Sequence, residues 1–162
     1  MKKLILVRHA KSSWKHDVID HQRPLKSRGV NDANLVSNRL KLDCNKIDLL
    51  ISSDANRTKS TANIFIANLN LDNNIVRFNH DLYDFSGEDL IKVIEECNDK
   101  VNCLMVFGHN HAITAFVNIF GSVHIDNVPT SGVVVIEFNS KKWSSLKQGQ
   151  TLKTIFPRDL KS

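Results

Sequence analysis

Cysteine is scarce in this chain. Of 162 residues, only Cys44, Cys97 and Cys103 carry a thiol, and no two of them form a C-x-x-C pair. An odd number of cysteines without paired spacing argues against a disulfide-stabilised scaffold and against a zinc knuckle. Isolated thiols suit a reducing compartment, so we expect a cytoplasmic protein.

Long hydrophobic runs are also missing. The first apolar run covers only residues 4–7 before Arg8, which is too short for the core of a signal peptide. No segment approaches the ~20 apolar residues that a membrane-spanning helix needs. Because 41% of the residues are hydrophobic and 24% are charged, the composition is typical of a globular protein. We therefore expect a single domain over residues 1–162 that does not enter a membrane.

The net charge of +5 is unevenly distributed. Residues 1–30 hold eight Lys or Arg against two acids, and residues 141–162 hold six against one, so the middle of the chain is net negative. No stripe of basic residues interleaved with aromatic ones is present. This distribution argues against a nucleic-acid-binding surface.

Strand patterns alternate with helix patterns along the chain. The apolar runs at 4–7 and 101–107 are continuous, as expected of strands buried on both faces. Further strands are predicted over 48–52, 75–78, 132–138 and 151–156, and helices are predicted from Pro24, over 56–69, after an N-cap at Ser86, and over 111–120. This alternation predicts the α/β class, as a three-layer α/β/α sandwich around a mostly parallel sheet.

Basic and imidazole side chains follow three of the predicted strands. Arg8 and His9 follow the first strand, Arg57 opens the helix after the second, and His109 follows the strand at 101–107. Ligands of such sheets bind beyond the carboxyl ends of the strands, where helix N-termini add N–H donors. The four side chains therefore predict a site for a phosphoryl group.

Each of these residues has a simpler interpretation when taken alone. Arg8 also suits a charge at a strand end, His9 a packed ring, and Arg57 an exposed helix position. His109 and His111 also suit a metal-binding pair or a helix cap, although no carboxylate accompanies them at metal-like spacing.

Three short motifs resemble the blocks of the histidine phosphatase superfamily, also called phosphoglycerate mutase-like. They are Arg8-His9-Ala10, Ser53-x-x-x-Arg57-Thr58-x-x-Thr61-Ala62 and Gly108-His109-Asn110, and Ala10 replaces the glycine that the family usually carries. With Arg23-Pro24-Leu25-x-x-Arg28-Gly29, the short chain is most similar to the SixA-type phosphohistidine phosphatases. The resemblance implies a phosphoglycerate mutase-like fold for nearly the whole chain.

The resemblance also implies catalytic roles. His9 is the expected nucleophile, which forms a phosphohistidine intermediate while its second ring nitrogen donates to an acceptor that the sequence does not identify. Arg8 and Arg57 are expected to bind phosphoryl oxygens, and His109, protonated against a dianion, to donate to another. No metal and no cofactor is implied.

A second group of residues is expected to bind substrate: Ser12, Trp14, Lys15 and Arg23. Ser12 and Trp14 match the mutase pattern, whereas Lys15 replaces an asparagine that contacts phosphate. The alternatives are a packed aromatic for Trp14, a surface lysine for Lys15 and an exposed loop arginine for Arg23.

The general acid for the leaving group is not evident. Asp84 and Glu88 are candidates, and Glu88 also suits the first turn of a helix, where acids favour the dipole. The leading hypothesis is a metal-independent, monomeric hydrolase of phosphoramidates or phosphomonoesters that works through phospho-His9, and the resemblance implies a phosphohistidine protein as its substrate. The alternatives are a phosphatase of small metabolites and a non-catalytic module that binds phosphate or nucleic acid.

Overall fold

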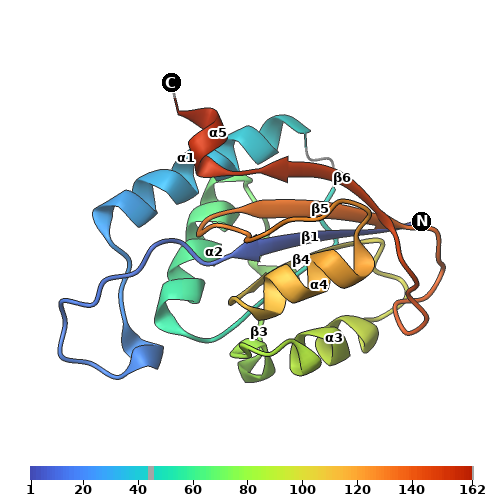
Figure 1. Ribbon diagram of the computed structural model, residues 1–162, viewed down its shortest axis with the longest axis horizontal. Coiled ribbons are helices and arrows are strands. Elements are labelled where there is room, and N and C mark those ends of the chain that lie inside the picture. Colours follow the sequence, from blue (N-terminus) through green and yellow to red (C-terminus); the bar gives the residue numbers. More distant parts are fainter. Residues whose placement is uncertain (44–45, 162) are drawn as a thin grey trace.

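The computed structural model describes residues 1–43 and 46–161, so Cys44 lies outside the described residues. Its centre is a six-stranded sheet in the order β3-β2-β4-β1-β5-β6 (Figure 1). The strands are β1 (Lys2–Arg8), β2 (Leu49–Ser52), β3 (Val76–Phe78), β4 (Cys103–Gly108), β5 (Val133–Phe138) and β6 (Gln150–Ile155). The α/β class is confirmed.

The sheet is mixed rather than mostly parallel. Strands β1, β4, β2 and β3 pair in parallel, whereas β5 runs antiparallel to both β1 and β6. The reason lies in the connection before β5, which returns to the carboxyl end of β1. There the Ser131 amide donates to the Arg8 carbonyl at 3.1 Å, so β5 begins where β1 ends.

Helices cover both faces of the sheet, as the prediction of three layers requires (Figure 1). In β1, Leu4 and Leu6 pack in the core beneath α3 (Glu88–Glu95) and α4 (Ala112–Phe120), whereas Ile5 and Val7 pack in the core beneath α1 (Ser27–Asp43) and α2 (Asn56–Asn68). This alternation follows from the two-residue period of a strand. The described residues also form the short helix α5 (Pro157–Leu160) and three 3₁₀ turns, η1 (Asp20–Gln22), η2 (Asn73–Ile75) and η3 (His80–Leu82).

The first helix begins three residues later than the sequence predicts. Instead of opening α1, Pro24 belongs to a segment that pairs with the loop after β1, through the Ser13 amide and the Pro24 carbonyl at 2.8 Å. Gly29 explains the close packing of that loop on α1, because a Cβ there would lie 2.2 Å from the Lys11 carbonyl oxygen. The loop is thereby held over the carboxyl end of the sheet.

Among the helices of the described residues, none combines the length and the apolar character required to cross a lipid bilayer.

Candidate active site

The carboxyl ends of the parallel strands bring the predicted site residues together. The backbone ladder continues past the strand ends, because the His9 amide donates to the Gly108 carbonyl and the Ser53 amide to the Phe107 carbonyl. Arg57 enters from the first turn of α2. We call Arg8, His9, Arg57 and His109 the inner wall of the site.

His9 is held in one ring orientation. Its Nδ1 donates to the Ala10 carbonyl oxygen at 2.7 Å, which supplies the acceptor that the sequence does not identify. Nε2 then carries the lone pair and lies 3.4 Å from Nε of Arg57. Burial, together with the charges of Arg57, Arg8 and Arg23, lowers the pKa of His9 to about 3, although the bond to Ala10 opposes this shift. The ring is therefore neutral at neutral pH, and its unprotonated Nε2, which accepts from Nε of Arg57, is the nucleophilic nitrogen.

A threonine couples the nucleophile loop to α2. The Ala10 amide donates to Oγ1 of Thr61, and this hydroxyl donates in turn to the Arg57 carbonyl, both at 2.8 Å. The position of His9 and that of Arg57 thus depend on one hydroxyl group. Thr61 is part of the second sequence motif, but the motif by itself predicts no function for this residue.

His109 is fully buried beside His9, with 5.2 Å between the ring centroids. Its Nε2 contacts Oγ of Ser53 at 2.8 Å, and its Nδ1 lies 3.5 Å from Nη2 of Arg57. Burial, with the neighbouring His9 and Arg57, lowers the pKa of His109 to about 2. The ring is neutral in this structure, so the protonated form expected from the sequence requires the charge of a bound dianion.

Arg8 has a hydrogen-bond donor that is not paired among the described residues. Its Nη1 donates to the Val128 carbonyl at 2.9 Å, while its buried Nε has no hydrogen-bond partner among the residues described. Burial lowers the pKa of this guanidinium. An unpaired buried donor is costly, and a bound anion would satisfy it.

Asp20, which sequence reasoning missed, joins the two loop-facing arginines. Its carboxylate accepts from Nη2 of Arg57 at 3.0 Å and from Nη1 of Arg23 at 2.9 Å, and the Tyr83 hydroxyl donates to it as well. Burial alone would raise the pKa of Asp20, but these hydrogen bonds hold it well below its ordinary value. In the sequence, Asp20 differs from its surroundings only as an acid within a basic segment.

The predicted substrate-binding residues divide into two groups. Arg23 is buried, not an exposed loop arginine, and its guanidinium donates to the Ser12 hydroxyl and stacks 3.3 Å from the Trp14 ring centroid. Trp14 is 74% exposed, so it is not a packed aromatic. Lys15 is exposed as well, and its backbone amide donates to the Ser13 hydroxyl.

Neither predicted acid is placed as a proton donor. Asp84 accepts from the amides of Ser86, Gly87 and Leu90, so it caps α3 in place of the predicted Ser86. Burial would raise the pKa of Asp84, but these amides lower it. Glu88 is exposed in the first turn of α3.

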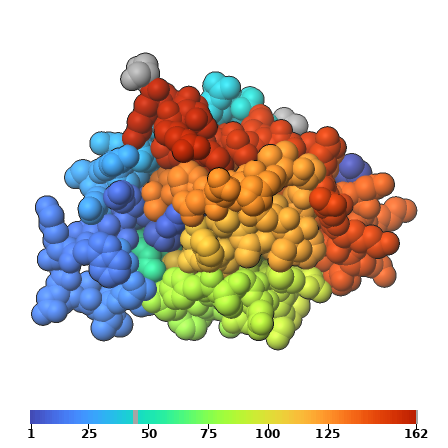
Figure 2. Space-filling view, in the orientation of Figure 1, coloured from blue at the N-terminus to red at the C-terminus, as the bar shows by residue number. Residues whose placement is uncertain are grey.

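Aromatic rings also border the site. Tyr83 and Phe85 each lie edge-on to His109, with centroids 5.3 Å away. We call Trp14, Asp20, Arg23, Tyr83 and Phe85 the rim of the site. In Figure 2 the blue N-terminal loop faces the green segment that follows β3, and the teal start of α2 is visible between them.

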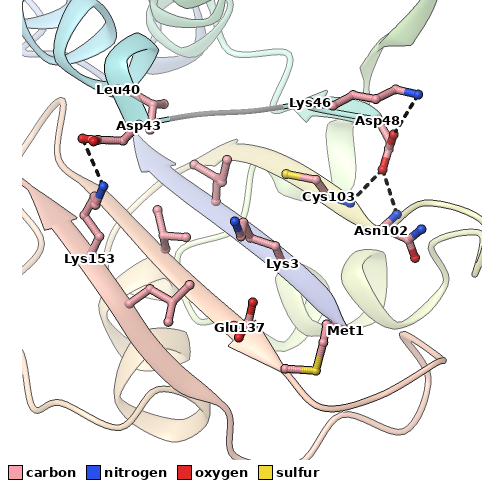
Figure 3. A pocket seen from close by; sticks show the side chains of 13 residues that line it. Met1, Lys3, Leu40, Asp43, Lys46, Asp48, Asn102, Cys103, Glu137 and Lys153 are labelled. Carbon is pink, nitrogen blue, oxygen red and sulfur yellow. Dashed lines mark hydrogen bonds and ion pairs between the residues drawn. The ribbon is translucent and has the colours of Figure 1, made fainter.

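A cavity of about 480 Å³ lies elsewhere, at the amino ends of β1 and β4 (Figure 3). Its charged residues are largely paired, for example Lys153 with Asp43 and Lys46 with Asp48. It contains none of the predicted site residues.

The family model of the histidine phosphatase superfamily (branch 1) matches residues 4–84, which make up half of the chain. The matched segment includes Arg8, His9 and Arg57 of the inner wall. The chain belongs to the histidine phosphatase superfamily. Membership supports a phosphatase activity for this superfamily protein.

Solved structures and a sequence relative resemble this chain over most of its length. The protein histidine phosphatase SixA complexed with tungstate has a TM-score of 0.79 at 20% identity, covering 98% of this chain and 99% of that one. Phosphoglycerate mutase from Bacillus anthracis has a TM-score of 0.64 at 16% identity, with 96% and 92% covered. These likenesses show a shared fold. An uncharacterized protein of Mycobacterium tuberculosis is 28% identical over 153 residues, covering 88% of this chain and 93% of that protein.

Proposed function

We propose that this protein hydrolyses phosphohistidine on protein substrates through a phospho-His9 intermediate, without a metal ion. The observation that carries the proposal is the His9 ring, whose Nδ1 is held by a carbonyl and whose unprotonated Nε2 faces Arg57. An imidazole fixed in this tautomer can attack phosphorus as soon as a phosphoryl group binds between the arginines and His109.

In the first step a bond forms between Nε2 of His9 and phosphorus while the bond to the leaving imidazole breaks. Arg8 and Arg57 compensate the charge on the phosphoryl oxygens, and His109 donates once the dianion has raised its pKa. Water then attacks the phosphoenzyme, which releases inorganic phosphate and restores neutral His9.

The carboxyl groups nearest the site favour phosphohistidine over alkyl phosphates. Asp20 and Asp84 both have lowered pKa values, so both are ionised and unsuited to protonating an alkoxide. When the ring of a phosphohistidine is already protonated, its imidazole leaves as a neutral group, so the reaction needs no such acid.

Exposed apolar side chains around the site favour a protein substrate. Trp14, Ile19 and Phe85 are all substantially exposed, and Phe85 also contacts the His109 ring. Apolar side chains at the mouth of a charged site offer contact area to a protein surface.

The test compares wild type with His9→Ala on a phosphohistidine protein, an aryl phosphate and an alkyl phosphate. We expect kcat/KM to fall along this series of rising leaving-group basicity, and His9→Ala to abolish turnover while remaining folded. Acid-labile, alkali-stable phosphate should be trapped on wild type. His124→Ala, which changes an exposed histidine, should behave as wild type. Equal rates on alkyl phosphates would favour the metabolite phosphatase instead, and an active His9→Ala would refute the mechanism.

A further inference from the structure

Three side chains of metal-ligand type converge beside the rim, outside the inner wall. His21 comes from η1, Asp54 follows β2, and His80 opens η3. Nε2 of His21 lies 2.9 Å from Oδ1 of Asp54, and Nδ1 of His80 lies 2.9 Å from both oxygens of the same carboxylate. Residues that are far apart in the sequence thus present three donor atoms to one point.

The donor atoms have the spacing and chemistry of a transition-metal site. One ligand atom from each residue can be chosen so that all three lie within 4.8 Å of one another. Tetrahedral ligands ~2.1 Å from Zn²⁺ are roughly 3.4 Å apart, so small ring rotations bring the three atoms to that geometry. Two imidazoles and one carboxylate favour Zn²⁺ or Co²⁺ over Mg²⁺ or Ca²⁺.

We propose that His21, Asp54 and His80 form a binding site for a divalent transition metal of the Zn²⁺ type, separate from the catalytic histidines. Each ring now shares a proton with Asp54. On binding, that proton moves to the other nitrogen of the same ring, and the freed lone pair binds the metal. Three protein ligands leave a fourth position for water.

The site is near the inner wall but distinct from it. The Tyr83 ring contacts His21 and His80, with centroids 5.0 and 5.7 Å away, and it also contacts His109. His21 directly follows Asp20, which binds Arg57. A metal ion would therefore tie η1 to the ends of β2 and β3 and hold the rim in place.

The chain contains a matched control. His124 and Asp126 form another histidine–carboxylate contact at 2.9 Å, and both are exposed. Neither belongs to a group of three ligands among the described residues. Loss of this pair should leave metal binding unchanged, because two ligands on an exposed surface bind weakly.

The experiment titrates the full chain with Zn²⁺ by calorimetry and with Co²⁺ by visible absorption. We expect one equivalent to bind wild type, with tetrahedral Co²⁺ bands and slower hydrogen exchange over residues 16–23. His21→Ala, Asp54→Asn and His80→Ala should each weaken binding by more than about tenfold, since even loss of a supporting residue costs 10–100-fold. His9→Ala and His124→Ala should bind as wild type does.

Circular dichroism and Tm establish that each variant is folded, which is expected because all three ligands are at least partly exposed. Saturation of wild type without a difference between the ligand variants and His124→Ala would overturn the proposal. Loss of binding in His9→Ala would overturn it too, because the metal would then occupy the inner wall. Since binding is measured without substrate, its failure is independent of whether the protein hydrolyses phosphohistidine.

Discussion

The inner wall and the rim are held in different ways. His9 and His109 directly follow strands, and hydrogen bonds from their own and neighbouring backbone groups set their positions. The rim depends on side chains that meet across the site, chiefly Asp20 with Arg23, Arg57 and Tyr83. Hydrogen bonds between backbone groups remain when a side chain is replaced, whereas an ion pair is lost with either of its side chains. We therefore expect changes in the inner wall to remove chemistry and changes in the rim to adjust it.

After the loss of His9 itself, the largest effect is expected from Arg57→Ala. Nε and Nη2 of this guanidinium face His9 and His109, where the phosphoryl oxygens would lie. Loss of one preorganised donor of this kind costs about 10²–10³-fold in kcat, or ~2.7–4 kcal/mol. Steady-state kinetics on an aryl phosphate measure the loss. Arg77→Ala, which removes an exposed arginine of β3, is the control and should retain full activity.

Stability should fall as the pH decreases below the ordinary histidine range. Because the pKa values of His9 and His109 are lowered to about 3 and about 2, the unfolded chain binds protons below pH ~6.5 that the folded protein does not. This stabilisation is complete above pH ~6.5 and is lost at roughly 1.4 kcal/mol per pH unit for each histidine. Urea unfolding between pH 7 and 5 measures the slope.

Orthovanadate tests the origin of that slope. A bound dianion favours the protonated His109 ring, so saturating vanadate should reduce the loss of stability at low pH. An unchanged slope in His9→Gln and in His109→Gln would contradict the assignment to these two rings.

A smaller effect is expected from Asp20→Ala. The carboxylate binds the outer edge of Arg57, and its loss leaves that guanidinium less well oriented toward His9. We expect kcat/KM to fall by about tenfold, which corresponds to ~1.4 kcal/mol and to one charge-assisted hydrogen bond. Asp17→Ala changes the other acid of the same loop and should have no effect. Equal activity of the two variants would show that the rim does not orient the inner wall.

The smallest effect on activity is expected from Asp84→Ala. This carboxylate caps α3 through three backbone amides, so its loss should lower the free energy of unfolding by about 0.5–2 kcal/mol. Activity on phosphohistidine should remain close to wild type. A selective loss on alkyl phosphates would instead identify Asp84 as the general acid.

The positions of Arg8, His9 and His109 in the inner wall could be predicted from the chain because these residues end a strand or directly follow one. Once residues 4–7 and 101–107 are parallel strands, the side chains that follow them must lie at one edge of the sheet. Asp20 could not be predicted in this way. Its partners Arg57 and Tyr83 are 37 and 63 residues away, and no local pattern encodes contacts across a loop.

Residue order and apolar periodicity were sufficient for the α/β class, the two faces of the sheet and the edge at which the chemistry lies, since each depends on local backbone geometry. Tertiary structure decided the antiparallel direction of β5, the late start of α1, the role of Asp84 as a cap, and the convergence of His21, Asp54 and His80. The Asp84 cap depends on the turn just before α3, and the other three depend on how loops return across the sheet. The cause is energetic, because a loop adopts the path whose long-range hydrogen bonds and ion pairs offset its lost conformational entropy.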